Sequence, residues 1–169
     1  MLAEGEARFR GEAVAAVIGT RAAIEALDVA RFPVTWEALQ PVMGLDAAMM
    51  EGAPLVQAEK TGNLLLDGGV KRGNVTAAFR ACAAVAQATF ETAFVEHAYI
   101  EPEAGWARMV NGRLEVHVTT QTPYMDRDEV ALVMKRDARQ VRIVPSACGG
   151  GFGGKLDLSV QPLIALGAW

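Results

Sequence analysis

The chain has 169 residues, of which 51% are hydrophobic and 21% charged, and its formal net charge is −4. This composition is typical of a globular protein and argues against a disordered one. The acidic balance argues against broad attraction to nucleic acid or anionic lipid. No apolar run reaches the roughly 18 residues that cross a bilayer, and the acidic N-terminus lacks the layout of a signal peptide. We therefore expect a cytoplasmic protein with no nucleic-acid or membrane partner.

The first fifty residues are predicted to form a strand, a helix and a further extended segment. Small apolar side chains dominate residues 12–18, which is typical of a strand buried on both faces. Thr20 is a good N-cap for a helix over 21–30, because its hydroxyl can accept a hydrogen bond from a free N–H group. Pro33 ends that region, and residues 32–36 are expected to be extended.

The middle of the chain is predicted to be a connector followed by a helix and a strand. Glycine and proline residues punctuate the stretch from 43 to 73, which indicates a connector that crosses a surface. Asn74 is expected to cap a helix that runs through Ala84. Alternation of apolar and polar side chains over 87–94 favours a strand.

The last third carries the clearest pattern. Asn111-Gly112 is the best two-residue hairpin signal, and it joins apolar-rich segments at 106–110 and 114–120. The pattern then predicts a helix over 124–135, with Val130, Leu132 and Val133 facing inward, a short buried strand over 141–144 and a C-terminal helix within 156–169. Because proline is costly inside a helix, that last helix is expected to begin or bend near Pro162.

Two cysteines, Cys82 and Cys148, are the only thiols of the chain. Iron–sulfur clusters and structural zinc sites take three or four thiolate or imidazole ligands, so neither is expected within this chain. Cys82 lies in an apolar run and is interpreted as a buried thiol. Packing is the favoured interpretation for Cys148 as well.

The stretch that organises the chain is the loop from Gly149 to Lys155, which we call the glycine loop. Five of its seven residues are glycine. Without a Cβ the backbone can adopt positive φ and can present several N–H groups to one ligand. Concave rows of N–H groups bind anions. The sequence therefore predicts an anion-binding loop.

Two nucleotide-binding motifs match this loop by spacing. Gly149 and Gly154-Lys155 have the spacing of a P-loop, but Leu156 stands where a Ser or Thr would bind magnesium. The dinucleotide pattern Gly-x-Gly-x-x-Gly also fits, but it needs an acidic residue roughly 20 positions later. The chain ends before that position.

A third interpretation draws on more of the chain, because several segments in collinear order resemble one family. This is the molybdopterin-binding subunit of the xanthine dehydrogenase and aldehyde oxidase family. The segments that carry the resemblance are 9–17, 72–74, 96–104 (Glu-His-Ala-Tyr-Ile-Glu-Pro-Glu-Ala), 119–123 (Thr-Thr-Gln-Thr-Pro), 141–145 and the glycine loop.

The resemblance implies an α+β fold in two parts. Residues 1–50 would be the strand-helix-strand end of an α/β hammerhead domain. Residues 51–169 would be a connector and the opening, mixed α/β part of a truncated molybdopterin-binding domain. In the family, the glutamine matching Gln121 reaches an oxygen ligand of the molybdenum, and the glycine loop lies against the metal and pterin. The implied cofactor-binding residues are Gln121, Gly150, Gly151, Phe152 and Gly153.

The resemblance also implies an activity, which is hydroxylation of an aldehyde or nitrogen heterocycle with oxygen from water. The molybdenum–molybdopterin cofactor would belong to the complete subunit, and iron–sulfur clusters and FAD to partner chains or domains. The chain departs from the family pattern at Leu156, where several members carry an acid, and at Asn74, which replaces an aspartate. The apolar pattern is unfinished at Trp169, and the family's catalytic glutamate lies beyond it. No catalytic or metal-ligating residue is therefore assigned, and the chain alone is expected to be inactive.

Non-catalytic interpretations stay open beside this one. The chain could be a remnant or one half of a split subunit, with a purely structural glycine loop. An incomplete domain would expose apolar surface, so self-association or binding of the missing C-terminal part is expected. Gln121 could satisfy backbone groups at the end of the hairpin, and Lys155 could contact a phosphate or stay solvated. His97, Tyr99 and Glu101 share one face of an extended segment, and His117 is interpreted as a packing or surface residue.

Overall fold

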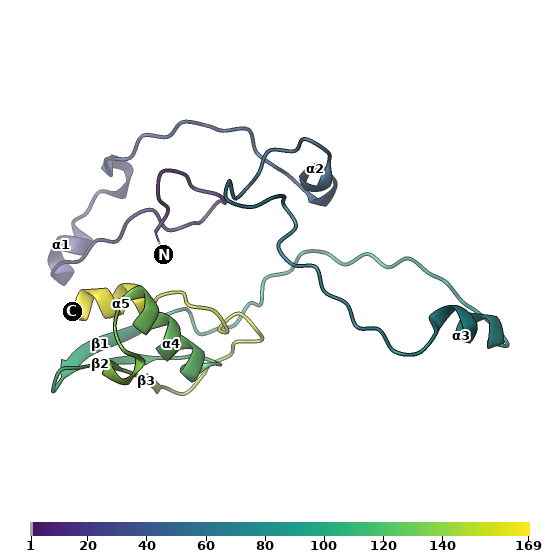
Figure 1. The fold of residues 1–169 in the computed structure, drawn as a ribbon. Helices are drawn as coiled ribbons and strands as arrows, with labels where there is room; N and C mark the ends of the chain where they lie inside the picture. The colour runs from purple at the N-terminus through teal and green to yellow at the C-terminus, as the bar shows by residue number, and fades with distance from the viewer. Residues whose placement is uncertain (1) are drawn as a thin grey trace. The chain divides into compact units, whose positions relative to one another are not determined.

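The structure is a computed structural model that describes residues 2–169. The chain divides into two compact units, one made of residues up to 27 together with 94–169, the other of residues 28–93. The first unit holds α1 (Arg21–Glu25), β1 (Gly105–Val110), β2 (Arg113–Val118), α4 (Pro123–Val133), the 3-10 helix η2 (Ala138–Gln140), β3 (Val141–Pro145) and α5 (Gln161–Ala168) (Figure 1). The second holds the 3-10 helix η1 (Val29–Arg31), α2 (Leu45–Met49) and α3 (Val75–Ala81).

The predicted hairpin is confirmed. Strands β1 and β2 pair antiparallel, with Gly105 opposite Val118 and Val110 opposite Arg113. The turn residue Asn111 has a φ of 50°. Gly112 follows with a φ of 76°, and two successive positive φ values are what a tight two-residue hairpin turn requires.

Strand β3 extends the hairpin into a mixed sheet, because it adds to β2 in parallel and gives the order β1-β2-β3. Parallel neighbours need a long crossover, and α4 with η2 supplies it here. The α4 prediction is confirmed, with Pro123 in the first turn, where its missing N–H costs nothing. Of the three residues expected inward, Val130 is buried, but Leu132 is 78% exposed and Val133 is exposed too.

The core lies on one face of this sheet. Leu114, Val116 and Val118 alternate along β2 and are buried, as side chains two residues apart share a face. Helices α4 and α5 pack against that face (Figure 1), where they add Val130 and Ala165. Each fully buried valine or leucine stabilises the fold by about 1.5–3 kcal/mol. This small core positions the loop that follows β3.

Two strand predictions are wrong. Residues 12–18 and 87–94 are irregular and almost entirely exposed. A strand needs a neighbouring strand to bond its backbone groups, and among residues 2–169 no strand pairs with these segments; 12–18 receives a single backbone bond of this kind, from the N–H of Ala3 to Ala13 O at 2.7 Å. The strand-helix-strand expected in the first fifty residues therefore reduces to its helix, α1. Thr20 caps α1 as predicted, with its hydroxyl accepting from the N–H of Ala23 at 3.3 Å.

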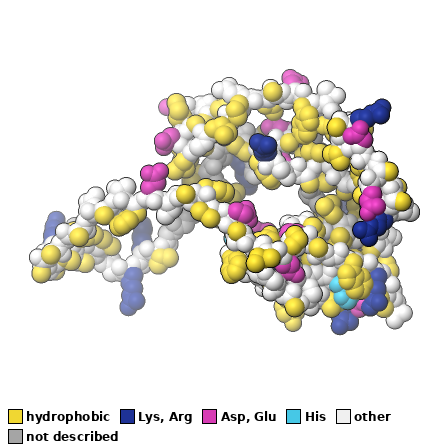
Figure 2. Space-filling view, turned by 180° about the vertical axis from the view of Figure 1, so that it is seen from behind, with side chains coloured by type: hydrophobic (Ala, Val, Ile, Leu, Met, Phe, Trp, Pro, Cys, Tyr) yellow, Lys and Arg dark blue, Asp and Glu magenta, His cyan; other side chains and the backbone are white. Residues whose placement is uncertain are grey.

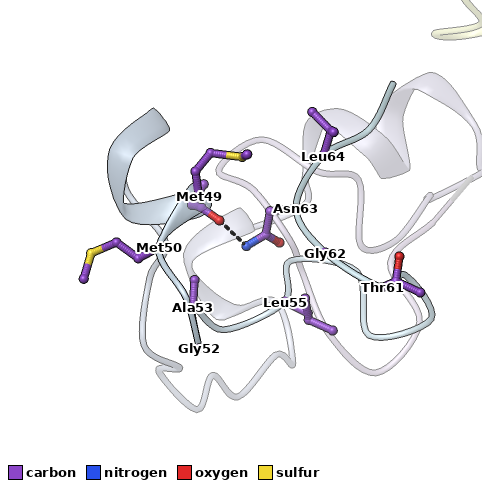
Figure 3. A pocket seen from close by; sticks show the side chains of 10 residues that line it. Met49, Met50, Gly52, Ala53, Leu55, Thr61, Gly62, Asn63 and Leu64 are labelled. Carbon is purple, nitrogen blue, oxygen red and sulfur yellow. Dashed lines mark hydrogen bonds between the residues drawn. The ribbon is translucent and has the colours of Figure 1, made fainter. Parts of the chain in front are cut away.

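The second unit, residues 28–93, consists of short helices joined by irregular segments. Asn74 caps α3 as predicted, since its Oδ1 accepts from the N–H of Ala77 at 2.9 Å, but the helix ends at Ala81. The side chain of Asn63 holds the 48–63 segment together. Its Oδ1 accepts from the N–H of Val56 at 2.9 Å. Its Nδ2 donates to Ala48 O at 3.0 Å, which is the hydrogen bond marked in Figure 3. It also donates to Pro54 O at 2.9 Å. These bonds lie beside a shallow pocket that is lined by residues of the 48–64 stretch.

Buried side chains occur only in the last third of the described chain. Between residues 2 and 113 no described residue is buried, whereas β2, α4 and α5 all contribute buried positions. Large apolar side chains such as Phe94 and Ile100 are almost fully exposed. Figure 2 shows hydrophobic side chains over much of the visible surface. Over residues 2–169, no helix combines the length and apolar character needed to cross a bilayer.

Candidate functional site

The glycine loop begins four residues after β3 ends at Pro145. Its backbone changes handedness repeatedly: φ is 120° at Gly150, 52° at Phe152 and 96° at Gly153. Glycine adopts such values without strain, whereas Phe152 is a non-glycine residue in the left-handed region. Inside the loop, the N–H of Gly154 donates to Gly151 O at 2.8 Å.

Gln121 holds the middle of this loop. Its Oε1 accepts from the N–H of Gly153 at 3.0 Å and from the N–H of Lys155 at 3.3 Å. Its own backbone N–H donates to Lys155 O at 3.0 Å. A Cβ on Gly151 would lie 2.8 Å from Cδ of Gln121, which is closer than a side chain can approach. Of the two roles predicted for Gln121, satisfying backbone groups near the end of the hairpin is confirmed.

Glu101 holds both ends of the loop through one oxygen atom. Its Oε2 accepts from the N–H of Gly149 at 2.7 Å and from Nζ of Lys155 at 2.8 Å. A Cβ on Gly149 would lie 2.7 Å from Cβ of Glu101. The first position of the loop is therefore glycine because the 96–104 segment lies directly against it.

Lys155 is buried, with 1% of its surface exposed. Its Nζ also donates to Thr119 Oγ1 at 3.1 Å and to Glu101 O at 3.2 Å, and it lies 4.6 Å from the ring centroid of Tyr99. A buried ammonium is tolerated when it is paired and hydrogen-bonded in this way. Neither sequence interpretation of Lys155 anticipated this, since the side chain is not solvated and points to a carboxylate.

The charges of this pair are mutually stabilised. The Lys155 hydrogen bond is the main cause that holds the pKa of Glu101 below its ordinary value, and the N–H of Gly149 adds to it. Burial alone would lower the pKa of Lys155, but the hydrogen bond and the charge of Glu101 outweigh burial and raise it. Both groups are therefore ionised around neutral pH.

His97, Tyr99 and Glu101, which were predicted to share one face, all lie against the glycine loop. A Cβ on Gly154 would lie 2.7 Å from Tyr99 Cε1 and 3.1 Å from His97 Cγ. The Tyr99 hydroxyl donates to Glu103 at 2.9 Å, and that hydrogen bond is the main cause that raises the pKa of the phenol. The predicted packing role of His117 is confirmed on the hairpin: the ring of His117, on β2, stacks on the ring of Trp106, on β1, at a centroid distance of 3.7 Å.

A series of hydrogen bonds connects the 96–104 segment, which contacts the loop, to helices α5 and α4. Ser159 Oγ donates to Glu103 at 2.8 Å, and the backbone N–H of Ser159 donates to Gln161 Oε1 at 2.8 Å. Gln161 Nε2 in turn donates to Asp126 at 3.1 Å. Asp126 is buried, and burial raises the pKa of its carboxyl. No sequence pattern indicated these hydrogen bonds, because the residues that form them come from separate elements.

The backbone N–H groups that have no partner in the described part of the chain determine what the glycine loop can bind. The N–H groups of Gly149, Gly153, Gly154 and Lys155 are all taken. The N–H groups of Gly150, Gly151 and Phe152 donate to no residue in the described 2–169 range, and neither does Nε2 of Gln121. Successive free N–H groups in a backbone of mixed handedness form an anion site. The five predicted cofactor-binding residues thus lie together, although the N–H of Gly153 is occupied by Gln121.

The expected packing of the two cysteines is wrong, because both thiols are exposed. The Cys148 thiol contacts Gly150 O at 3.3 Å, and in the second unit the thiol of Cys82, which follows α3 directly, donates to Ala78 O.

The P-loop interpretation of the glycine loop is disfavoured. A P-loop needs a helix directly after its lysine. Here α5 begins at Gln161, and Lys155 points to Glu101.

The loop and its supports match a known domain. A family profile described as the molybdopterin cofactor-binding domain matches residues 56–169, which include the whole site. The chain belongs to this family. It is 37% identical over 168 residues to the nicotinate dehydrogenase large molybdopterin subunit of Eubacterium barkeri, which covers 98% of this chain and 39% of that protein.

Other relatives agree with this assignment. A xanthine dehydrogenase molybdenum-binding subunit of Escherichia coli O157:H7 is 29% identical over 160 residues, covering 94% of this chain and 21% of that protein. An aldehyde oxidoreductase molybdenum-binding subunit of Escherichia coli strain K12 is 33% identical over 93 residues, covering 55% of this chain and 13% of that protein. The chain thus spans well under half the length of these oxidoreductase subunits, and the predicted family resemblance is confirmed.

Proposed function

We propose that this chain is part of a molybdenum hydroxylase large subunit and that its glycine loop and Gln121 hold the molybdenum–molybdopterin cofactor. The observation that carries the proposal is the set of unused N–H groups at Gly150, Gly151 and Phe152, next to the unused amide of Gln121. The cofactor is anionic and rich in oxygen, so neutral donors held in place suit it.

In this proposal each side chain has a distinct task. Gln121 uses its oxygen to fix the loop and its NH₂ group to donate to an oxygen of the cofactor. Gly151 and Gly149 let the backbone approach, since a Cβ at either position would collide with a neighbour. Phe152, with 76% of its surface exposed, would cover the bound cofactor by its apolar ring.

The proposed reaction is oxidative hydroxylation of a nitrogen heterocycle or an aldehyde. A carbon–hydrogen bond is replaced by a carbon–oxygen bond with oxygen from water, and two protons and two electrons are released. The cofactor supplies the two-electron redox chemistry when it is bound. The nearest acids do not serve as the base, because Glu101 is paired with Lys155 and Glu103 is bonded to Tyr99 and Ser159. We therefore assign no catalytic residue and expect no activity from residues 1–169 alone.

The architecture and partners follow from the same proposal. Residues 1–50 would belong to an α/β hammerhead domain and 51–169 to the opening of the cofactor domain, completed by further polypeptide of the subunit. Iron–sulfur and FAD domains or subunits would accept the electrons, in the cytoplasm.

An assembly role is the second candidate, and exposed apolar surface favours it. No described residue before Leu114 is buried, and several large apolar side chains are nearly fully exposed. Surfaces of this kind are covered in interfaces or associate with themselves. In this version the chain is one part of a split subunit and gains the catalytic base from its partner.

The deciding experiment measures molybdenum by elemental analysis, and pterin released by denaturation, in protein purified from cells that make the cofactor. The chain is tested with the subunits that accompany it, against nicotinate, xanthine and aldehydes. Near-stoichiometric metal and pterin are expected in the assembly, together with hydroxylation of at least one substrate class. An assembly that carries neither metal nor pterin would overturn the proposed function.

A further inference from the structure

The glycine loop is anchored by an ion pair between the buried Lys155 and the part-exposed Glu101, and both residues lie outside the set of proposed cofactor-contacting residues. Glu101 Oε2 accepts from the N–H of Gly149 at one end of the loop and from the side chain of Lys155 at the other, at 2.7 and 2.8 Å. Thr119, at the end of β2, gives Lys155 a further partner at 3.1 Å. One carboxylate therefore closes the loop into a ring and ties it to the sheet.

The pair also sets the charge beside the free N–H groups. Glu101 is the acid in direct contact with the loop, and an isolated carboxylate there would repel an anionic ligand. Lys155 cancels this charge at 2.8 Å, while its burial keeps the ammonium from the ligand side of the loop. Unit charges a few ångströms apart interact even where water reaches one of them, so the neutrality of the pair matters to whatever anion the loop holds.

We propose that Glu101 and Lys155 are positioning residues: the pair closes the glycine loop and keeps its surroundings neutral, so that the free N–H groups of Gly150, Gly151 and Phe152 stay aligned toward an anionic group. This inference rests on the proposed function for the identity of that group. The closure of the loop itself does not depend on it.

Neutral variants separate this role from simple packing. Lys155→Met keeps the apolar stem but leaves the Glu101 carboxylate unpaired. Glu101→Gln keeps an acceptor for the N–H of Gly149 and removes the charge. The double variant is again neutral and still has that acceptor. Lys71→Met, at an exposed position, is the matched control.

Hydrogen–deuterium exchange of the peptide that contains 149–155 is the first readout, in the protein purified with its accompanying subunits. Lys155→Met should speed exchange in this peptide by about tenfold or more while the β2 peptide stays protected. It should also lose most of its molybdenum and pterin. The double variant should recover a large part of both, because buried unpaired charge is removed. The Lys71→Met control should match the unchanged protein in both readouts.

The exchange rates and the molybdenum contents of these variants test the positioning role and the proposed function separately. If Lys155→Met leaves loop exchange unchanged, or if the double variant is as defective as Lys155→Met, the positioning role is overturned and the side chains only fill space. If Lys155→Met does not fold, exchange in Glu101→Gln and in the double variant decides the same question. If the unchanged protein carries no molybdenum or pterin, the proposed function fails, while the exchange comparison still tests loop closure.

Discussion

The side-chain oxygen of Gln121 lies 3.0 Å from the backbone nitrogen of Gly153 and accepts its hydrogen bond. This contact fixes the orientation of the amide, because an oxygen turned toward the loop leaves the NH₂ group on the other side. A single glutamine can therefore hold the loop and donate to a ligand at once. The two roles call for different atoms, and substitutions can separate them.

Gln121→Glu should preserve the loop and damage cofactor binding. A carboxylate still accepts from the N–H groups of Gly153 and Lys155, but it has no donor and adds a negative charge. Gln121→Ala should lose both functions, so loop exchange should rise only in this variant. Molybdenum content should fall about tenfold or more in both, in line with the loss of a charge-assisted hydrogen bond. Gln87→Glu, at an exposed position, controls for added charge. Full molybdenum content in Gln121→Glu would contradict the donor role.

Gly151→Ala should destabilise the loop, whereas Gly167→Ala should not. A Cβ at Gly151 would collide with the Gln121 amide, with Cδ 2.8 Å away. Overpacking of this kind costs about 1–3 kcal/mol. A Cβ at Gly167, in α5, meets nothing closer than 3.7 Å, and alanine favours a helix over glycine. Thermal unfolding of both variants tests the contrast. Equal midpoints would show that Gln121 moves aside without cost.

The Glu101–Lys155 pair predicts how loop stability depends on pH. The pKa of Glu101 is held below its ordinary 4.5, so its contribution is present above pH 4.5 and is lost as pH falls through the lowered pKa. The pKa of Lys155 is raised above its ordinary 10.5, so its contribution is present below that pH and is lost as pH rises through the raised pKa. Unfolding midpoints measured from acid to alkaline pH should fall more steeply at both ends in the unchanged protein than in the neutral double variant. Superimposable profiles would contradict this.

Local signals in the sequence predicted local structure well. Asn111-Gly112 gives its hairpin because both residues tolerate positive φ, and Asn74 caps α3 because its side chain reaches an N–H three residues away. Residues 12–18 carry an equally clear strand pattern but form no strand. A strand forms only beside a neighbouring strand, and the residue types of a segment do not show whether such a neighbour is present.

The glycine loop of the candidate site was predicted from the sequence, but the Glu101–Lys155 pair that supports it was not. The glycine content of 149–155 indicated an anion site, and the family resemblance placed Gln121 beside it. The burial of Lys155 could not be predicted, because lysine is rarely buried and its partner Glu101 lies 54 residues earlier. The sequence signals for this surface were the alternation of His97, Tyr99 and Glu101 and the family resemblance of 96–104, and neither indicated a buried lysine.

Asp126 provides the last prediction, because it is a buried acid whose partners are all neutral. Burial is the main cause that raises its pKa above the ordinary 3.8, against opposing hydrogen bonds from Thr120, Gln161 and Thr122. A raised pKa means that the protonated carboxyl is favoured in the fold. Stability from this group is therefore greatest below pH 3.8 and declines as pH rises through the raised pKa.

Asp126→Asn should therefore be tolerated or should stabilise the protein near neutral pH, by on the order of 1 kcal/mol for each pKa unit by which burial outweighs the hydrogen bonds. The amide oxygen can accept from Gln161, and the amide nitrogen can donate to Thr122. Asp126→Ala leaves the buried Nε2 of Gln161 without its acceptor and should cost about 1–3 kcal/mol. Denaturant unfolding at acid and neutral pH checks both, with Asp67→Asn as the exposed control. A loss of stability in Asp126→Asn at neutral pH would mean that the charge itself is required, and that Asp126 supports the Gln161–Ser159–Glu103 chain as a carboxylate.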